Sequence, residues 1–593
     1  MSTHEDRLKA LREQLARDRL SGFVVPLTDE HMSEYVGAYA QRLAWLTGFQ
    51  GSAGSAVVLS EAAAIFTDGR YTLQVREQVD ESHWQYQGIP QTSVAAWLGS
   101  NAPEGGRIGY DPWLHTRKWV EDATSSLKAR GAELVAVDTN PVDAVWPDRP
   151  EPGTAKLEPH DDTYAGQSSA DKRAKIGEWL ADRKADTVVL SALDSIAWAF
   201  NIRGSDVERT PVALAFALVH ADGTADLFVD PAKVGADLAA HLGNAVQVRD
   251  RLAFGDALDA LAGKTVAVDP QRAVAAIFNR LDDAGAIILS QRDPTILPKA
   301  IKNSVEITGH KAAQARDGAA LSRFLHWLSV EGPKGTQTEM SAADRLYEFR
   351  AEGGLLVDLS FDTIAGSGPN GAVVHYRAEE KTNRPVESGT LLLVDSGGQY
   401  RDGTTDVTRT VAIGTPTPEM VRNFTLVLKG HIALASATFP RGTKGGQLDV
   451  LARQYLWAEG LDYAHGTGHG VGSFLSVHEG PQRIGTSTEG DEPLAPGMIV
   501  SNEPGYYKTG EYGIRIENLV LVEPRDIAGA EREMLGFETL TLAPLDRMLI
   551  DRPLLNVRER AWIDAYHARV KAVIGPQLEG QALAWLEQAC IPL

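Results

Sequence analysis

The feature that most constrains the fold of this chain is a set of acidic and histidine side chains at the ends of short apolar segments between residues 366 and 518. A charged group at the end of a buried strand costs free energy unless it has a partner. Such a set therefore favours a fold in which separate strands bring their ends together. The residues concerned are Asp395, Asp406, His469, Glu503 and Glu517.

Two of these residues belong to one predicted hairpin. The apolar runs Thr390–Asp395 and Asp406–Ile413 flank a Gly-rich loop, a pattern that predicts two strands joined by a turn. Asp395 ends the first strand and Asp406 begins the second, so both carboxylates can converge on a common point. Either aspartate alone is better explained as a turn cap. The pair is what indicates a site.

Three histidines fall in the segment HGTGHGVGSFLSVHEGP. His465 and His469 are four apart and would share a helix face, but the alternating glycines make a helix implausible here. A tight, irregular loop whose glycines let the backbone bend around a site is the better interpretation. His478 follows at the end of the next apolar run.

The two glutamates follow different patterns. MIVSNEPGYY places Glu503 directly after an apolar strand, and EYGIRIENLVLV places Glu517 inside one. By a period of two, Arg515 and Glu517 share a strand face opposite the neighbouring isoleucines. For this segment alone, a structural Arg–Glu pair on a solvated face is an equal alternative.

Together these side chains form an oxygen-rich set of metal ligands. Four carboxylates repel one another, and about two divalent cations would make their convergence tolerable. Carboxylate and imidazole ligands suit Mn, Fe, Co or Zn, and the single cysteine, Cys590, excludes a thiolate cage. Paired metals about 3.5–4 Å apart are known in aminopeptidases, where they generate hydroxide and stabilise a tetrahedral intermediate.

Composition limits the partners and the compartment. The net charge is −21, with 79 acidic against 58 basic side chains, which argues against nucleic acid as a partner. The first residues read as an amphipathic helix through Leu8, Leu11 and Leu15, without the apolar core of a secretory signal. No apolar run approaches the roughly 20 residues of a membrane span. One cysteine favours a reducing compartment. We therefore expect a cytoplasmic protein without membrane or nucleic-acid partners.

Length and internal similarity predict several domains, because 593 residues exceed the about 250–300 of one hydrophobic core. A strand–turn–strand layout in residues 20–75 returns further along the chain, where Ala197-Trp198-Ala199 matches Ala44-Trp45-Leu46. We interpret this as a duplication. A Pro-rich linker follows Pro147. The spacing of Leu321, Leu325 and Leu328, four and then three residues apart, predicts a long helix from Ser304 to Val330, followed by strands to about residue 525 and a helical tail. The expected domains are 1–152, 153–298 and 299–593.

Five motifs in this order resemble the creatinase/aminopeptidase P/methionine aminopeptidase group, and most closely the long, three-domain type of aminopeptidase P. They are GSGPNGAVVHY, LLLVDSGGQYRDGTTDVTRT, HGTGHGVG, SNEPGYY and YGIRIEN. The resemblance implies an α/β (α+β) protein in which two related creatinase-type N-terminal α/β domains precede a pita-bread catalytic domain with a C-terminal extension. It also implies a metallopeptidase that hydrolyses the N-terminal Xaa-Pro bond of peptides by a two-metal-activated hydroxide.

The resemblance also implies roles for single residues. Asp406 and Glu517 would bridge two divalent metal ions, and Asp395 would chelate one of them. His469 and Glu503 would complete the coordination of the other ion, and Glu503 would also transfer the proton of the nucleophilic water. The remaining implied catalytic residues are three histidines that would hydrogen-bond the substrate and an arginine that would orient the carboxylates: His375, His465, His478 and Arg515. Mn²⁺ is the family expectation, with Zn²⁺ or Co²⁺ as alternatives, and long members are homodimers.

Four other kinds of protein share parts of this pattern. Prolidase, a dipeptidase, shares the metal set but carries one N-terminal module. Methionine aminopeptidase leaves some 300 N-terminal residues unexplained, and creatinase lacks the ligands found here. A non-catalytic peptide-binding pita-bread module has no reason to retain all five ligands. The interpretation that this sequence favours is therefore an enzyme acting on peptides with proline at the second position.

Overall fold

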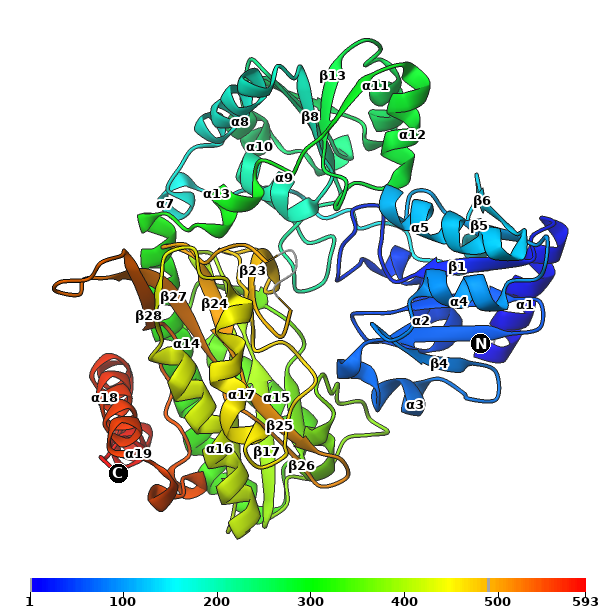
Figure 1. The fold of residues 1–593 in the computed structure, drawn as a ribbon. Coiled ribbons are helices and arrows are strands. Elements are labelled where there is room, and N and C mark those ends of the chain that lie inside the picture. Colours follow the sequence, from blue (N-terminus) through cyan, green and yellow to red (C-terminus); the bar gives the residue numbers. More distant parts are fainter. Residues whose placement is uncertain (1–2, 488–490) are drawn as a thin grey trace. The chain divides into compact units, whose positions relative to one another are not determined.

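The computed structural model describes residues 3–487 and 491–593 (Figure 1). The chain divides into two compact units, one with residues up to 162 and residues 167–296, and the other with residues 163–166 and 297–593. Its secondary structure is a mixture of helices and strands in both units, as the α/β prediction requires.

The first unit contains two six-stranded sheets built to the same plan. Their strand orders are β4-β3-β2-β1-β5-β6 and β12-β11-β10-β8-β13-β14. The first sheet contains β1 (Gly22–Pro26), β2 (Ser55–Leu59), β3 (Ala63–Thr67), β4 (Gln85–Gly88), β5 (Arg107–Tyr110) and β6 (Glu133–Ala136). The second contains β8 (Thr187–Leu190), β10 (Phe216–His220), β11 (Ala225–Phe228), β12 (Val246–Arg249), β13 (Thr265–Val268) and β14 (Ile287–Ser290).

The strand directions also repeat between the two sheets. In each sheet, the first three strands in chain order pair antiparallel, and the three remaining pairings are parallel. The matched tryptophans, Trp45 and Trp198, lie on corresponding helices between the first and second strands, α2 (Arg42–Thr47) and α9 (Leu193–Phe200). The predicted duplication is confirmed strand by strand.

Helices of the first unit cover these sheets. In the N-terminal helix α1 (His4–Arg17), Leu8, Leu11 and Leu15 are buried, as the amphipathic pattern predicts. The other helices are α3 (Gln74–Gln78), α4 (Val94–Asn101), α5 (Arg117–Leu127), α6 (Pro141–Ala144), α8 (Ser169–Arg183), α10 (Ala236–Leu242), α11 (Phe254–Asp259) and α12 (Ala275–Ala284). Between α6 and the short β7 (Glu158–Pro159), which pairs with β9 (Ile202–Arg203), the Pro-rich segment contains neither helix nor strand.

The second unit begins with a long helix. α14 spans Ser304–Glu331, one residue beyond the predicted end, and starts at a capping box between Asn303 and Glu306. Its predicted leucine stripe is buried. The other helices of the unit are α15 (Glu339–Ala351), α16 (Pro418–Ala435), α17 (Asp449–Trp457), α18 (Val557–Ile574) and α19 (Gly580–Ala589), while α7 (Asp162–Ala165) and α13 (Ile296–Ala300) lie where the two units divide.

The described residues of this unit form four sheets. A six-stranded sheet has the order β21-β28-β27-β24-β22-β23, and two three-stranded sheets have the orders β16-β17-β20 and β15-β18-β19. The six-stranded sheet contains β21 (Thr438–Pro440), β22 (Gly468–Gly470), β23 (Glu479–Ile484), β24 (Ile499–Asn502), β27 (Asn518–Arg525) and β28 (Met534–Thr539). The others contain β15 (Leu356–Leu359), β16 (Ile364–Ser367), β17 (Thr390–Ser396), β18 (Gly398–Tyr400), β19 (Gly403–Thr404) and β20 (Val407–Ile413), and the pair β25 (Gly505–Lys508) and β26 (Tyr512–Arg515).

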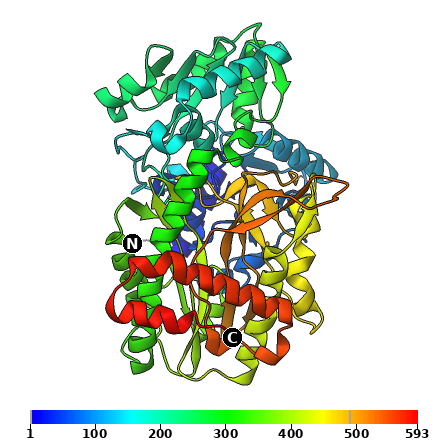
Figure 2. The same ribbon diagram turned by 90° about the vertical axis from the view of Figure 1, so that its left-hand side faces the viewer.

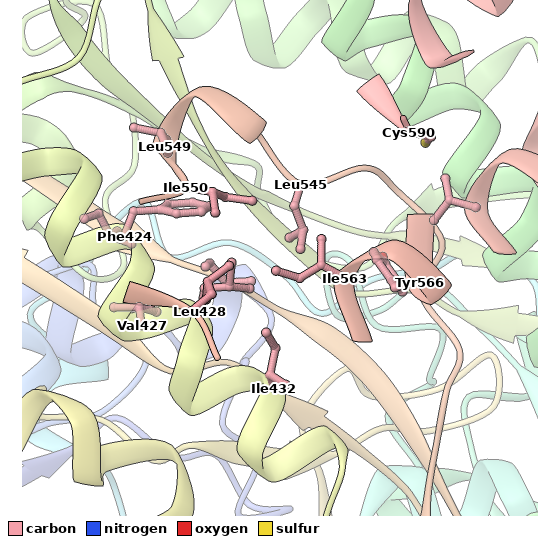
Figure 3. Packing of buried hydrophobic residues seen from close by; sticks show 14 of the residues in the cluster. Phe424, Val427, Leu428, Ile432, Leu545, Leu549, Ile550, Ile563, Tyr566 and Cys590 are labelled. Carbon is pink, nitrogen blue, oxygen red and sulfur yellow. The ribbon is translucent and has the colours of Figure 1, made fainter. Parts of the chain in front are cut away.

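The C-terminal part differs from its prediction by one strand. The last strand was expected to end near residue 525, but β28 follows and extends the six-stranded sheet by pairing with β27. The helices α18 and α19 then lie across one side of this unit (Figure 2). Apolar side chains of α16, α18 and the segment between β28 and α18 form one buried cluster (Figure 3).

Candidate metal centre

Three of the five predicted ligands converge in the second unit. The ligand atoms of Asp406, His469 and Glu517 all lie within 4.8 Å of one another. Glu503 adjoins this group, since His469 Nε2 lies 3.5 Å from Asp406 Oδ2 and 3.5 Å from Glu503 Oε1. The charges of Asp406 and Glu503 in turn act on Asp395. Side chains separated by more than a hundred residues thus form one cluster.

The predicted hairpin holds the two aspartates. β17 and β20 pair antiparallel from Thr390↔Ile413 to Ser396↔Val407, with Asp395 in β17 and Asp406 just before β20. The Gly-rich loop between them is more than a turn, because it forms β18 and β19, which pair with each other and with β15. The hairpin prediction is confirmed, and the loop has additional structure.

The surroundings of His469 correct the predicted irregular loop. His469 lies on β22, a short strand with a register shift against β23 just after this residue. A Cβ on Gly468 would lie 2.0 Å from the carbonyl oxygen of Ser501, and one on Gly470 would lie 2.1 Å from that of Glu479. The glycines therefore permit neighbouring strands to approach closely, and this is a different role from the backbone bends that the sequence predicted.

The two glutamates flank neighbouring strands of the six-stranded sheet. Glu503 follows β24, as predicted. Glu517 is not inside a strand, because it lies in the short break between β26 and β27, where the chain passes from the small sheet to the large one. The period-two prediction was wrong here because the strand ends at Arg515. β24 and β27 pair with Asn502 opposite Asn518, which brings the two glutamates to the same end of the pair.

Arg515 makes the contact expected of a residue that orients a carboxylate. Its Nη2 and Nε lie 2.7 and 3.1 Å from Asp395 Oδ2, and its Nη1 donates to the Tyr507 hydroxyl at 2.6 Å. Arg515 Nε also donates to Thr408 Oγ1, and Thr408 Oγ1 donates to Glu517 Oε2 at 2.8 Å. Thr408 and Tyr507 were missed by sequence reasoning.

Burial and mutual repulsion dominate the electrostatics of the cluster. Burial raises the pKa of Asp395 to about 6, against the opposing charge of Arg515. Burial and the charges of Asp406, Asp395 and Glu503 raise the pKa of Glu517 well above its ordinary value. Burial alone would lower the pKa of His469, but the hydrogen bond to Asp406 and the charges of Glu503 and Asp406 raise it to about 9.

This donor set fits divalent cations. Asp395 Oδ1 is buried and has no hydrogen-bond partner in the part of the chain that the structure describes. It belongs to a group of four carboxylates whose adjacent cations are Arg515 and, when protonated, His469. Carboxylate oxygens and one imidazole are ligands that Mn, Fe, Co and Zn accept. Bound cations would remove the repulsion that raises these pKa values.

The other three predicted histidines occupy different positions. The ring of His478 lies 4.3 Å from that of His469, edge to face. The next residue, Glu479, is fixed by two buried lysines, with Lys302 Nζ 2.6 Å from its Oε1 and Lys299 Nζ 2.9 Å from its Oε2. Buried ion pairs of this kind hold the start of β23, and therefore His478, in place.

His465 and His375 lie at the borders of the cluster. His465 Nε2 is 2.8 Å from the Tyr507 hydroxyl and its Nδ1 is 2.7 Å from the carbonyl oxygen of Gly466. His375 is partly exposed and follows the turn Gly368–Ala372, which packs closely on β26. Its loop is anchored by Glu339, whose carboxylate accepts a hydrogen bond from the neighbouring Tyr376 at 2.8 Å.

Sequence models of known families match most of the chain. Metallopeptidase family M24 matches residues 308–524, and its C-terminal region matches residues 533–593. The creatinase/prolidase N-terminal domain matches twice, over residues 7–145 and 148–306. The cluster lies entirely within the first of these matches.

Full-length relatives decide the family. A probable Xaa-Pro aminopeptidase P of Tuber melanosporum is 41% identical over 99% of both chains, and one of Laccaria bicolor is 42% identical over 99% of this chain and 93% of the relative. The chain belongs to the aminopeptidase P family. An X-prolyl aminopeptidase from Caenorhabditis elegans, described as a cytosolic enzyme with a di-nuclear active site, matches over 100% of both chains with a TM-score of 0.95 and 34% identity.

Family membership confirms the predicted fold class, with two creatinase-type N-terminal domains and an M24 pita-bread domain. As an aminopeptidase P family member the chain is a metallopeptidase, and a dinuclear centre agrees with the fit of the acidic cluster. Among the residues that the structure describes, no helix combines the length and apolarity that a membrane crossing requires.

Proposed function

We propose that the protein is a cytoplasmic, two-metal aminopeptidase that removes the first residue from peptides with proline at the second position. The observation that carries this proposal is the convergence of Asp406, His469 and Glu517 in a chain that aligns end to end with Xaa-Pro aminopeptidase P relatives. The single cysteine and the cytosolic relative support the compartment. Fractionation of cells that express the tagged protein tests that part.

The proposed ligands are the five residues named from the sequence. Asp395, Asp406, His469, Glu503 and Glu517 would together hold two divalent cations, and the short distances among Asp406, His469, Glu503 and Glu517 support this set. When bound, two divalent cations would supply an acidic water and polarise the scissile carbonyl. Mn²⁺ is proposed over Zn²⁺ or Co²⁺ because oxygen donors predominate. Activity recovered by stripped protein with each metal in turn tests this choice.

Protein side chains would carry the proton and orient the substrate. The Glu503 carboxylate would accept the proton of the attacking water and return it to the leaving proline nitrogen. Ser501 Oγ donates to Glu503 Oε1 at 3.1 Å and accepts from the His469 amide at 2.9 Å, which supports a fixed position for this base. His375 and His478 are the proposed donors to the carbonyl oxygen.

His465 is proposed to act through Tyr507. The Tyr507 hydroxyl accepts from Arg515, so its own proton is directed to His465 Nε2. That arrangement leaves Nδ1–H of His465 to donate to the carbonyl oxygen of Gly466. His465, Tyr507 and Arg515 thus form one chain of hydrogen bonds that ends on Asp395.

Arg515→Lys is expected to weaken metal binding while preserving the charge. Lysine lacks the planar fork that places Nη2 on Asp395 and Nη1 on Tyr507. Groups that orient metal ligands in this way are worth about 10–100-fold in metal affinity or activity. Calorimetric titration with Mn²⁺ measures the change, and Arg525→Lys, at the far end of β27 in the six-stranded sheet and paired with Glu523, serves as the control. Unchanged Mn²⁺ affinity in Arg515→Lys would count against this role.

Proline at the second position fits hydroxide chemistry. An Xaa–Pro bond has no N–H, so a protease that needs this donor loses a contact and a metal-activated hydroxide loses none. The test compares an Xaa-Pro-Yaa tripeptide, an Xaa-Pro dipeptide and an Xaa-Ala-Yaa tripeptide with added Mn²⁺. Release from Xaa-Pro-Yaa is expected. Release from the dipeptide alone would favour prolidase, and no release at all would favour the peptide-binding module.

We also propose the domain division 1–152, 153–298 and 299–593 and a homodimer. The separation of the two compact units at Ile296 and Leu297 and the family matches support the division. Val450 and Trp457, half exposed and seven residues apart on α17, support a contact through the catalytic unit. Sedimentation equilibrium of the full chain tests the dimer.

A further inference from the structure

A buried arginine, Arg409, contacts the backbone of the proposed metal centre. Arg409 is 2% exposed, and Nη1 donates to the carbonyl oxygens of Thr408 at 2.8 Å and Glu517 at 2.7 Å. Nη2 donates to Asn518 Oδ1 at 2.8 Å and to the Tyr566 hydroxyl at 2.8 Å. These acceptors are neutral oxygens. A buried cation held in this way depends on every contact, because each lost bond leaves part of its charge unsolvated.

A buried histidine joins the two glutamate-bearing strands. His431 of α16 has Nε2 3.0 Å from Asn518 Nδ2 and Nδ1 3.1 Å from the carbonyl oxygen of Asn502. Asn502 precedes Glu503, Asn518 follows Glu517, and the two asparagines are opposite each other in the sheet. Burial, with the nearby charge of Arg409, lowers the pKa of His431 to about 3. Its neutral ring therefore accepts at Nε2 and donates from Nδ1.

Two side chains of helix α18, in the C-terminal part of the chain, contact Arg409 and His431. Besides accepting from Arg409, the Tyr566 hydroxyl donates to the carbonyl oxygen of Ala543 at 2.8 Å. Trp562 stacks on Tyr566 with 5.3 Å between ring centres and meets His431 edge to face at 5.9 Å. Tyr566 of α18 points into the buried apolar cluster, which also contains Ile432, the residue that follows His431 in α16 (Figure 3).

We propose that α18 is a positioning element of the metal centre. Through Tyr566 and Arg409 it fixes the backbone of Glu517, and through Trp562 and His431 it fixes the strand ends that carry both glutamates. This inference rests on the proposed function and deepens it. The C-terminal extension then sets the geometry in which the carboxylates receive their cations, although none of the five proposed ligands lies on it.

The rigid guanidinium of Arg409 explains how α18 can act on the backbone of Glu517. Arg409 is planar, so its contacts with Tyr566 and with the carbonyl oxygen of Glu517 are set by one rigid group. When the hydroxyl is removed, Nη2 retains Asn518 and the carbonyl oxygen of Ala543, but the guanidinium loses the bond that comes from α18. The guanidinium then tilts, and its two contacts beside the ligands loosen with it.

Tyr566→Phe tests the proposal on the full-length protein. We expect the variant to fold, to bind Mn²⁺ about 10–100-fold more weakly by calorimetry, and to show a changed visible spectrum when loaded with Co²⁺. With saturating Mn²⁺, kcat for an Xaa-Pro-Yaa peptide is expected to fall while KM stays close to wild type, because the substrate contacts are not altered.

The matched control is Ile563→Val on the same helix. Ile563 is fully buried in the same cluster, and this change removes apolar packing and no hydrogen bond. It is expected to lower the melting temperature and to leave Mn²⁺ affinity and the Co²⁺ spectrum unchanged. Trp562→Leu, which removes the ring against His431, is a second variant and is expected to behave like Tyr566→Phe.

The outcomes are distinguishable. Tyr566→Phe and Trp562→Leu can give the same Mn²⁺ affinity and the same Co²⁺ spectrum as Ile563→Val. That result would overturn the positioning role of α18 and leave the proposed function standing. A wild-type protein that binds no Mn²⁺ and releases nothing from Xaa-Pro-Yaa would instead overturn the proposed function, and this inference with it.

Discussion

Asp406→Asn is expected to abolish peptide hydrolysis while leaving the chain folded. Asp406 Oδ2 lies 3.5 Å from His469 Nε2, and Asp406 belongs to the three-residue cluster, so it is one of the carboxylates that would hold the proposed ions. An asparagine side chain offers one neutral oxygen in place of a charged pair. Release of the first residue from Xaa-Pro-Yaa with added Mn²⁺ is the assay.

The same hairpin provides a matched control. Asp402, four residues earlier, pairs with Arg316 through two hydrogen bonds and is not part of the cluster. Asp402→Asn is expected to retain hydrolysis. In the metal-free state, Asp406→Asn is expected to melt no lower than wild type, because one negative charge leaves a group of mutually repelling carboxylates. Wild-type hydrolysis by metal-stripped Asp406→Asn would contradict the proposed mechanism.

Removal of bound metal is expected to abolish activity and to lower the free energy of unfolding. A ligand that binds the folded state stabilises it by about 2.7 kcal/mol when its free concentration is about 100 times Kd. The loss is expected to reach at least this size, because bound cations relieve the repulsion between the buried carboxylates of Asp395 and Glu517, and this relief strengthens metal binding. Denaturant unfolding with and without Mn²⁺ measures it.

The metal-free protein should also show a characteristic pH dependence. Burial raises the pKa of Asp395 from 3.8 to about 6. The folded chain therefore holds this proton more tightly than the unfolded chain. The stability that protonation contributes is fully present below about pH 4 and is lost as the pH rises through about 6. Unfolding free energies of stripped wild type and stripped Asp395→Asn should diverge across this window. Parallel curves for the two proteins would contradict a buried Asp395 whose pKa is raised.

The parts of the fold that sequence predicted are those set by local pattern. A continuous apolar run ending in a charge correctly predicted β17 with Asp395 and β24 followed by Glu503. The leucine spacing predicted α14 to within one residue. The duplication was visible because both copies place Trp45 or Trp198 between the same two strands.

The rest depended on contacts between distant segments. Glu517 looks like a strand residue because the apolar residues Ile514, Ile516 and Leu519 flank it, yet the chain changes sheets there. The glycines beside His469 predict bends, whereas in the structure the neighbouring strand backbones leave no room for a Cβ at these positions. Contacts such as Thr408 with Glu517 join residues 109 positions apart.

Supporting residues were the hardest to predict, because nothing in their local sequence distinguishes them. Arg409 stands in an ordinary strand pattern and His431 in an ordinary helix, and each is defined only by what it meets after folding. Thr408 carried one available signal. It follows Asp406 by two residues in an extended segment, so it shares the face of that carboxylate.

The most direct test of the account is the number of metal ions that the acidic cluster binds. Calorimetric titration of stripped wild-type protein with Mn²⁺, checked by elemental analysis of protein purified without chelator, is expected to give two ions per chain and to restore hydrolysis of Xaa-Pro-Yaa. Asp406→Asn should bind fewer ions and remain inactive. Full hydrolysis by protein that contains no metal would contradict a two-metal centre. Two tightly bound ions in Asp406→Asn would also contradict it.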